Sequence, residues 1–155
     1  MKIIPRKATE ADLDLYFNWT NDPDTRHNSF NTQVVDYQEH TNWFLKKLND
    51  KNALLLVFEN EEKITVGQVR IEQKSNENII GISIDKNFRG LGLAMPMLEI
   101  SCKIFFEAFQ EKNINAYIKK SNLASLKSFQ KAGFDLVNDL IIGKEPSYIL
   151  VKKNV

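Results

Sequence analysis

The sequence predicts an α/β fold in which helices pack against a mixed β-sheet. The chain has 155 residues, the usual size of one globular domain. Strand-like and helix-like segments follow one another in the order β, α, α, β, β, β, α, β, α, β, β. Residues 52–60 are apolar without alternation, which is typical of a strand covered on both faces. We therefore expect a single domain at residues 1–155, with about seven strands and about four helices.

The N-terminal part contains one strand and two helices. Residues 3–8 indicate a short edge strand, because Pro5 lacks the amide that a central strand uses. A capping-box pattern begins at Thr9 and predicts a helix that runs to about Trp19. The same pattern begins at Asp36 and precedes an amphipathic helix.

Three strands and a long helix follow. Residues 52–60 and 64–72 are separated by a polar turn and predict a hairpin, and residues 78–85 predict a further strand. From Leu93 to Phe109 the apolar residues recur at helical spacing. This pattern predicts a helix with one face against the sheet.

The C-terminal part contains a strand, a helix and two more strands. Residues 115–119 predict the first strand, and residues 121–133 predict a helix that Gly133 closes as a C-cap. Residues 134–142 and 147–153 predict the last two strands. No repeat, linker or low-complexity tract interrupts this order.

Composition excludes several classes of protein. Lys and Arg number 21 against 20 for Asp and Glu, so no bulk charge attracts nucleic acid or a membrane surface. The longest apolar run, Ala53 to Phe58, is far too short to span a bilayer, and the N-terminus lacks a signal-peptide pattern. Cys102 is the only cysteine and there are two histidines. We therefore expect a cytoplasmic protein with no internal disulfide and no dedicated metal site.

The stretch "SIDKNFRGLGLAMPML", residues 83–98, places Gly90 and Gly92 between a strand and a helix. Such a loop turns tightly and points backbone amides at a ligand, beside the positive end of the helix dipole. Pro96 fits the first turn of that helix, and Arg89 adds a charged donor. The pattern indicates a phosphate site, although a plain tight turn would use the same glycines.

Two better-known glycine loops fit poorly. A nucleoside-triphosphate loop needs Lys and then Ser or Thr after the last glycine, where this chain has Leu93 and Ala94. A dinucleotide fingerprint needs a small residue where this chain has Met95. The remaining ligand for this loop is a diphosphate carried by a molecule other than a nucleoside triphosphate or a nicotinamide dinucleotide.

Residues 82–94, "ISIDKNFRGLGLA", resemble the coenzyme-binding motif of the GNAT superfamily of acyl-CoA-dependent N-acetyltransferases, with Asn87 where Gln or Arg is usual. Residues 121–134, "SNLASLKSFQKAGF", resemble the closing segment of that family. The resemblance implies a mixed sheet splayed at its centre and acetyl-CoA as co-substrate. It also implies the residues that hold the coenzyme, which are Ile82, Ser83, Ile84, Arg89, Gly90, Leu91, Gly92, Leu93, Ala94, Asn122, Ser125 and Phe129.

The resemblance also implies direct attack of an amine on the thioester, without an acyl-enzyme. Many relatives protonate the thiolate with a Tyr at the position of Phe129, which cannot do so. Either water or another hydroxyl must then protonate the thiolate, and Tyr117 and Ser125 are the candidate catalytic residues. Tyr117 would serve equally as an aromatic residue packed on the sheet. Cys102 lies among apolar neighbours and is expected in the core.

The acceptor amine is expected to bind the segment from Trp19 to Trp43. Its pattern resembles the GNAT subgroup that acetylates amino groups on nucleotide-linked sugars, and also relatives that acetylate protein N-termini. The candidate substrate residues are Trp19, Arg26, Ser29, Phe30, Glu39 and His40. For the tryptophans a place in the core is the alternative, and for Glu39 and His40 a solvated helix face.

Two other functions stay open: acetylation of a protein N-terminus or another small amine, and a non-catalytic acyl-CoA-binding module. The first differs only in the acceptor. The missing Tyr favours the second, and the intact glycine loop favours an enzyme. The expected partner is a small-molecule amine, with no nucleic acid and no membrane, and both a monomer and a homodimer fit the sequence.

Overall fold

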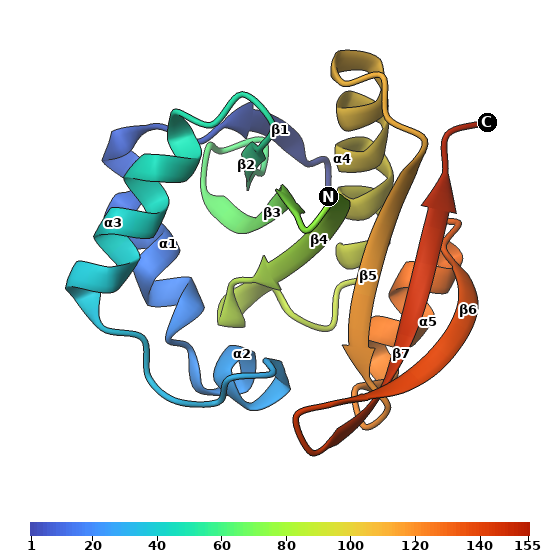
Figure 1. The fold of residues 1–155 in the computed structure, drawn as a ribbon. Coiled ribbons are helices and arrows are strands. Elements are labelled where there is room, and N and C mark those ends of the chain that lie inside the picture. Colours follow the sequence, from blue (N-terminus) through green and yellow to red (C-terminus); the bar gives the residue numbers. More distant parts are fainter.

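The computed structural model describes residues 1–155 and contains one seven-stranded sheet with helices on both faces (Figure 1). The strand order is β1-β2-β3-β4-β5-β7-β6. The strands are β1 (Ile4–Lys7), β2 (Leu54–Glu59), β3 (Thr65–Lys74), β4 (Glu77–Ile84), β5 (Asn113–Lys119), β6 (Asp135–Ile142) and β7 (Glu145–Lys153). The helices are α1 (Leu13–Thr20), α2 (Pro23–Asn28), α3 (Tyr37–Leu48), α4 (Ala94–Ala108) and α5 (Leu123–Lys131). The mixed α/β fold predicted from the sequence is confirmed.

The sheet is split between β4 and β5. These two strands are parallel and pair only at Ile79 and Asn115, whereas every other neighbouring pair is antiparallel with at least four paired positions. Figure 1 shows β4 and β5 diverging toward their C-terminal ends. The peptide groups of β4 after Ile79 therefore have no strand partner on the β5 side.

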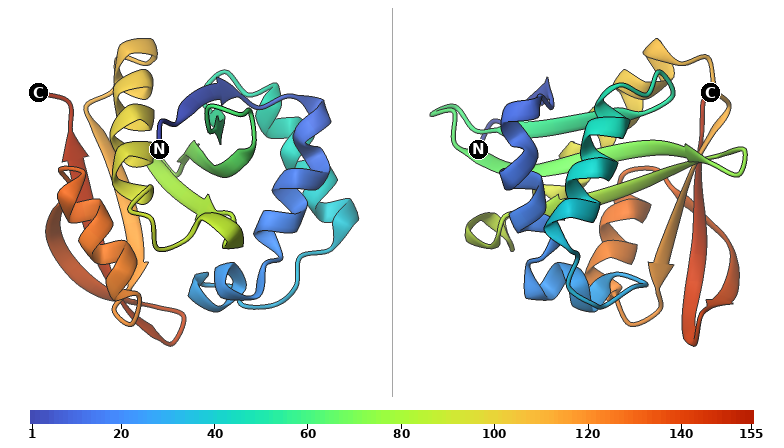
Figure 2. Two further views of the ribbon diagram at one scale, coloured as in Figure 1. Left: turned by 180° about the vertical axis from the view of Figure 1, so that it is seen from behind. Right: turned by 60° about the vertical axis from the view of Figure 1, so that its left-hand side comes forward.

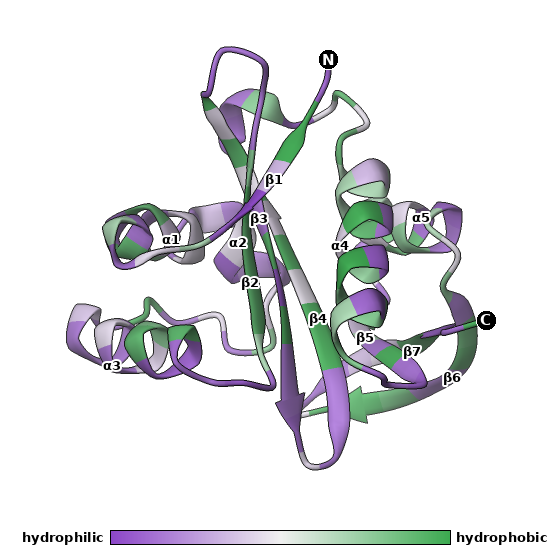
Figure 3. Cartoon of the chain, turned by 90° about the horizontal axis from the view of Figure 1, so that it is seen from above, coloured by the Kyte–Doolittle hydropathy of each residue, from purple (hydrophilic) through white to green (hydrophobic).

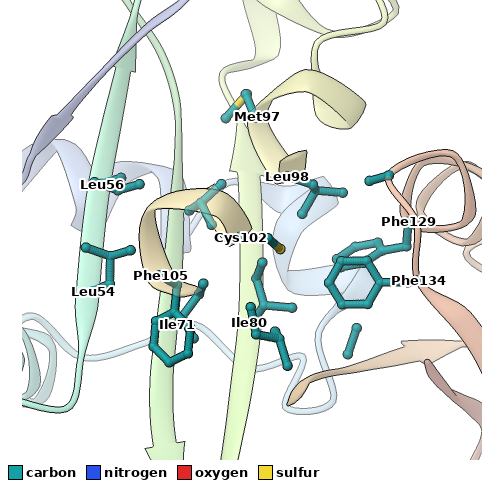
Figure 4. Packing of buried hydrophobic residues seen from close by; sticks show 14 of the residues in the cluster. Leu54, Leu56, Ile71, Ile80, Met97, Leu98, Cys102, Phe105, Phe129 and Phe134 are labelled. Atoms are coloured by element: carbon teal, nitrogen blue, oxygen red, sulfur yellow. The ribbon is translucent and has the colours of Figure 1, made fainter. Parts of the chain in front are cut away.

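The main core lies between the sheet and the pair α4 and α5. Its buried side chains include Met97, Cys102 and Phe105 from α4, Ile80 from β4 and Phe129 from α5 (Figure 4). The apolar face of α4 that the sequence predicts is thus the face that contacts the strands. Figure 3 shows α4 on one side of β2 to β4 and α1 and α3 on the other.

A second, smaller core lies under α1 and α3. It contains Tyr16, Trp19, Phe44, Leu55 and Val57. Leu55 and Val57 come from β2. The residues that alternate with them in this strand, Leu54, Leu56 and Phe58, are buried in the main core. This confirms that residues 54–58 form a strand buried on both faces.

Two N-terminal details differ from the sequence expectation. The first helix starts with a short 3-10 turn at residues 10–12 before α1 begins. Residues 21–24, "NDPD", open the additional helix α2, because Asp22 accepts hydrogen bonds from the amides of Asp24 and Thr25 and Pro23 occupies the first turn. Figures 1 and 2 both place α2 near the C-terminal end of β4. No helix of the structure combines the length and the apolar character needed to cross a membrane.

Candidate active site

A groove of about 980 Å³ occupies the split between β4 and β5. It is lined by both of these strands, by β3, by the loop before α4, by α5 and by the segment around α2. Most of the residues expected to bind coenzyme or substrate line it: Arg26, Ser29, Phe30, Ile82, Ser83, Ile84, Arg89, Gly90, Gly92, Leu93, Ala94, Tyr117, Asn122, Ser125 and Phe129. The side chains of Trp19, Glu39, His40 and Leu91 are not among the lining residues.

The two glycines before α4 have backbone angles that only glycine adopts easily. Gly90 has φ +75° and Gly92 has φ +73°, and a Cβ on either would point into open space. The first amides of α4 have no intrahelical acceptor, as in any helix, and the N-cap residue Leu93 offers them no side-chain acceptor either. Pro96 lies in the first turn, as the sequence predicts. The loop therefore presents backbone donors to the groove, as an anion site requires.

The free edge of β4 forms the wall next to this loop. On its other side the strand pairs with β3 as far as Gly67 and Ile84. Toward β5 the residues from Ile80 to Ile84 have no ladder partner. An extended molecule can therefore add to β4 as a strand would, through backbone hydrogen bonds.

Helix α5 forms the facing wall. The side-chain oxygen of Asn122 caps the helix by accepting a hydrogen bond from the amide of Ser125 at 3.3 Å. The ring of Phe129 is 4% exposed and packs edge-on against Phe134. Asn122 and Phe129 thus have clear structural roles, whereas the Ser125 hydroxyl makes no side-chain hydrogen bond within the protein.

Tyr117 extends from β5 into the groove and is hydrogen-bonded within it. Its hydroxyl donates to the carboxylate of Glu77, which also accepts from the Asn115 side chain at 2.7 Å. Burial, and then the bond to Glu77, raise the pKa of Tyr117 to about 12. The phenol therefore stays protonated at neutral pH, where it is a hydrogen-bond donor and not a base.

Arg89 is held by residues of α2 and its N-cap and by the end of β4. Its guanidinium donates to Asp22 at 2.7 Å, to Asp24 at 2.9 Å and to the carbonyl of Ile84 at 3.1 Å. Although burial alone would raise the pKa of Asp22, the hydrogen bond from Arg89 holds that pKa below its usual value. These contacts show that Arg89 anchors α2 to the glycine loop. Arg89 also lines the groove, and its expected contact with a phosphate stays a prediction.

Arg26 also has a structural role, and its expected contact with substrate stays a prediction. Its nitrogens donate to the carbonyls of Thr20, Asn31 and Gln33 and to the hydroxyl of Ser29. Every nitrogen of the guanidinium is thus used to hold the turn on either side of α2. The positive charge has no carboxylate partner, because all four acceptors are neutral.

The other expected substrate residues divide into two groups. Trp19 is 5% exposed and donates to Asp85 at 2.9 Å, and His40 is 3% exposed and contacts the carbonyl of Leu13 at 3.1 Å. Both belong to the packing under α1 and α3 because their rings are covered there. Glu39 is exposed on α3, away from the groove. Ser29 and Phe30 do line the groove.

Sequence analysis missed a group of charged residues on β3. Arg70, Glu72 and Lys74 line the groove from the face that carries α1 and α3. A signal was present, since Arg70 and Glu72 alternate with the apolar Val69 and Ile71 in a strand. Such alternation marks a strand with one polar face.

The seven-stranded sheet, the split at β4 and β5 and the glycine loop before α4 together define an acyltransferase fold of the type that sequence analysis expects. The family model of the acetyltransferase (GNAT) domain matches residues 2–135. The chain belongs to the GNAT acetyltransferase family.

Solved structures share this fold at low sequence identity. A spermidine N-acetyltransferase from Vibrio cholerae, in complex with CoA and spermine, is 16% identical, with a TM-score of 0.87 over 97% of this chain and 95% of that one. AAC(6')-Ib in complex with ribostamycin and coenzyme A is 15% identical, with a TM-score of 0.83 over 99% and 94%. These likenesses confirm the GNAT fold.

One curated relative is similar in sequence. An uncharacterized protein of Methanocaldococcus jannaschii is 29% identical over 137 residues, which is 86% of this chain. The chain spans 28% of the length of that relative.

Proposed function

We propose that this chain transfers an acetyl group from acetyl-CoA to a primary amine of a small molecule. The observation that carries the proposal is that one groove combines a glycine loop rich in exposed amides with an unpaired strand edge. The amides of the glycine loop suit a pyrophosphate, and the unpaired strand edge suits the peptide-like pantetheine arm of the coenzyme. The complexes of the two similar enzymes with CoA support this assignment.

In the proposed complex the coenzyme lies along one line of the groove. The amides from Arg89 to Ala94 hold the pyrophosphate, and the unpaired edge from Ile82 to Ile84 pairs with the pantetheine arm. Gly90 and Gly92 keep the loop open because neither has a side chain over it. The thioester then lies near the middle of β4, beside α5 and β5.

The amine attacks the thioester carbonyl directly, a tetrahedral intermediate forms, and the thiolate of CoA leaves. Tyr117 and Ser125 carry the two hydroxyls proposed to assist this step. Because burial raises the pKa of Tyr117 to about 12, its proposed contribution is a hydrogen bond to the developing charge and not removal of a proton. Its single O–H would have to turn from Glu77 to make this bond. Cys102 takes no part, since it is fully buried and burial raises its pKa to about 12.

The narrower expectation of a nucleotide-linked amino sugar has weaker support than the general reaction. Two of its candidate residues, Trp19 and Arg26, form hydrogen bonds within the protein through their side chains. Phe30 is the one aromatic residue of the expected set that lines the groove and is also exposed, at 38%. We therefore keep a nucleotide-linked amino sugar as one member of the acceptor panel.

Two measurements on the same protein test the proposed function. Calorimetry should detect binding of CoA, and a thiol-release assay with acetyl-CoA should give turnover with at least one amine. The panel contains spermidine, an aminoglycoside, a peptide with a free N-terminus and a nucleotide-linked amino sugar. CoA binding with no thiol release for any amine would favour the non-catalytic acyl-CoA-binding module, and no CoA binding would remove both functions.

A further inference from the structure

Two charged side chains of the β3 face, those of Lys74 and Arg70, have terminal nitrogens with no hydrogen-bond partner in the protein, and only the Arg70 guanidinium lies against Gly81. The side chain of Arg70 is 34% exposed and lines the groove. Only its Nε lies near a carboxylate, at 3.4 Å from Glu72. The two terminal nitrogens therefore present a planar pair of donors to whatever occupies the groove.

Gly81 makes room for this guanidinium. Arg70 and Gly81 are cross-strand partners of β3 and β4. A Cβ built on Gly81 would lie 2.7 Å from Cζ of Arg70 and 2.8 Å from both terminal nitrogens. The φ angle of Gly81 is not in the left-handed region, so backbone conformation does not require glycine there. The absence of a side chain lets the guanidinium rest flat on β4.

The charges around Arg70 leave an excess of positive charge. Glu72 is 6% exposed and is shared with Lys47, whose Nζ lies 3.4 Å away, and with the indole N–H of Trp43 at 3.2 Å. Lys47 also lies 3.6 Å from Asp50, so Glu72 and Asp50 together balance Lys47 and Arg70. The excess comes from two other cations that line the groove: Arg26, which is bound only to neutral oxygens, and Lys74, which has no carboxylate partner.

The proximity of the two arginines is visible in their electrostatics. Burial, and then repulsion from Arg70, lower the pKa of Arg26. By contrast, the carboxylates that line the groove are Asp24 and Glu72, and each already has a cation partner. The groove therefore offers unsatisfied positive charge and no unpaired carboxylate.

We propose that Arg70 binds an anionic oxygen group, a phosphate or a carboxylate, carried by the acceptor amine. The proposal rests on the acetyltransferase function proposed above. Its ligand is the acceptor and not the coenzyme phosphates, because Gly81 lies three residues, or about 10 Å, before the end of β4 at Ile84, and a 3-10 turn at Lys86–Phe88 follows before the glycine loop. Arg70 thus faces the thioester end of the groove.

The experiment measures binding of two matched probes to the CoA-loaded protein by calorimetry. Glucosamine 6-phosphate and glucosamine carry the same amine and differ in the phosphate. We expect the phosphate ester to bind roughly tenfold more tightly or better, because a bidentate, charge-assisted contact is gained. A second pair, 4-aminobutyrate and butylamine, tests a carboxylate in the same way and so tells the two anions apart.

The variants assign the preference to Arg70. Arg70→Ala should remove the preference for the anionic probe while leaving the binding of CoA and of the neutral amine unchanged. Arg70→Lys should restore part of it, since the charge returns without the planar pair of donors. Lys46→Ala removes an exposed charge on α3, outside the groove, and should leave the preference intact.

Gly81→Ala provides a second route if Arg70→Ala unfolds the protein. The added methyl group displaces the guanidinium while its charge remains, so the preference should fall several-fold. Equal binding of the probes in both matched pairs, no binding of any of the four, or a preference that survives Arg70→Ala and Gly81→Ala would overturn the proposal. CoA binding is measured first in each titration, so its loss in the wild-type protein would instead count against the proposed function.

Discussion

The coenzyme side and the acceptor side of the groove are built from different materials. On the coenzyme side the ligand-facing groups are backbone amides of the glycine loop and the unpaired edge of β4. On the acceptor side they are side chains of β3, β5 and the segment around α2. The coenzyme side is determined by the glycine turn and by the split in the sheet. The acceptor side is determined by which side chains have no partner within the protein.

This difference decides how each side responds to substitution. A backbone surface is lost when the backbone conformation changes, so its sensitive positions are glycines. A side-chain surface can lose one group and keep the rest. However, Arg26 on the acceptor side holds the segment around α2 in place, and Arg89 links that segment to the glycine loop. Variants there should affect stability before specificity.

The largest effect is expected for Gly92→Val. Valine at φ +73° costs about 1–2 kcal/mol of backbone strain, and its branched side chain projects into the open space over the loop. CoA affinity should fall at least roughly tenfold, because the amides no longer converge on the pyrophosphate. Calorimetric titration with CoA measures this loss directly.

Gly143→Val is the matched control for strain. Gly143 also has a positive φ, +62°, with open space around its missing Cβ, but it lies in the turn between β6 and β7. The melting temperature should fall by a similar amount in both variants, and the affinity for CoA should fall only in Gly92→Val. A folded Gly92→Val protein with wild-type CoA affinity would show that the coenzyme does not use this loop.

A smaller effect, on stability, is expected for Arg26→Ala. The substitution leaves the carbonyls of Thr20, Asn31 and Gln33 without their charged donor and should cost about 1–3 kcal/mol in the free energy of unfolding. Chemical denaturation followed by circular dichroism gives this value. An unchanged free energy of unfolding together with weaker acceptor binding would restore Arg26 as a substrate residue.

Most of the fold could be predicted from the sequence because its signals are local. Asp36 before an amphipathic run, Gly133 after one and Pro96 at a helix start each act within a few residues, and all three have the expected place in the structure. The glycine loop belongs to the same class, since a turn between a strand and a helix needs no distant partner.

The roles of the side chains around the acceptor side could not be predicted in the same way, because residues far away in the sequence determine which of them are engaged within the protein. Arg89 meets Asp22 across 67 positions of the sequence, and Trp19 meets Asp85 across 66. Nothing in the neighbourhood of either residue shows whether it faces substrate or protein. The same holds for Arg70, because the position of its guanidinium in the groove depends on the space that Gly81 leaves in the next strand.

The smallest effect tests whether His40 belongs to the packing under α1 and α3. Burial lowers the pKa of His40, although the contact with the Leu13 carbonyl and the charge of Asp14 oppose this shift. The folded protein therefore takes up its proton at lower pH than the unfolded chain, whose ordinary pKa is 6.5. The stabilisation by neutral His40 is complete above pH 6.5 and is lost as the pH falls from there through the lower pKa of the folded state. The free energy of unfolding should thus decline with falling pH in this window, and His40→Gln should flatten the decline.

The second histidine supplies the control, because His27 is exposed on α2. His27→Gln should leave the decline as it is in the wild-type protein. If His40 instead faced a substrate, its substitution would change acceptor binding and leave the pH dependence of stability as it was. That result would move part of α3 from the structural group to the acceptor site, whereas a flattened profile with unchanged acceptor binding would place the boundary of the site at α2 and β3.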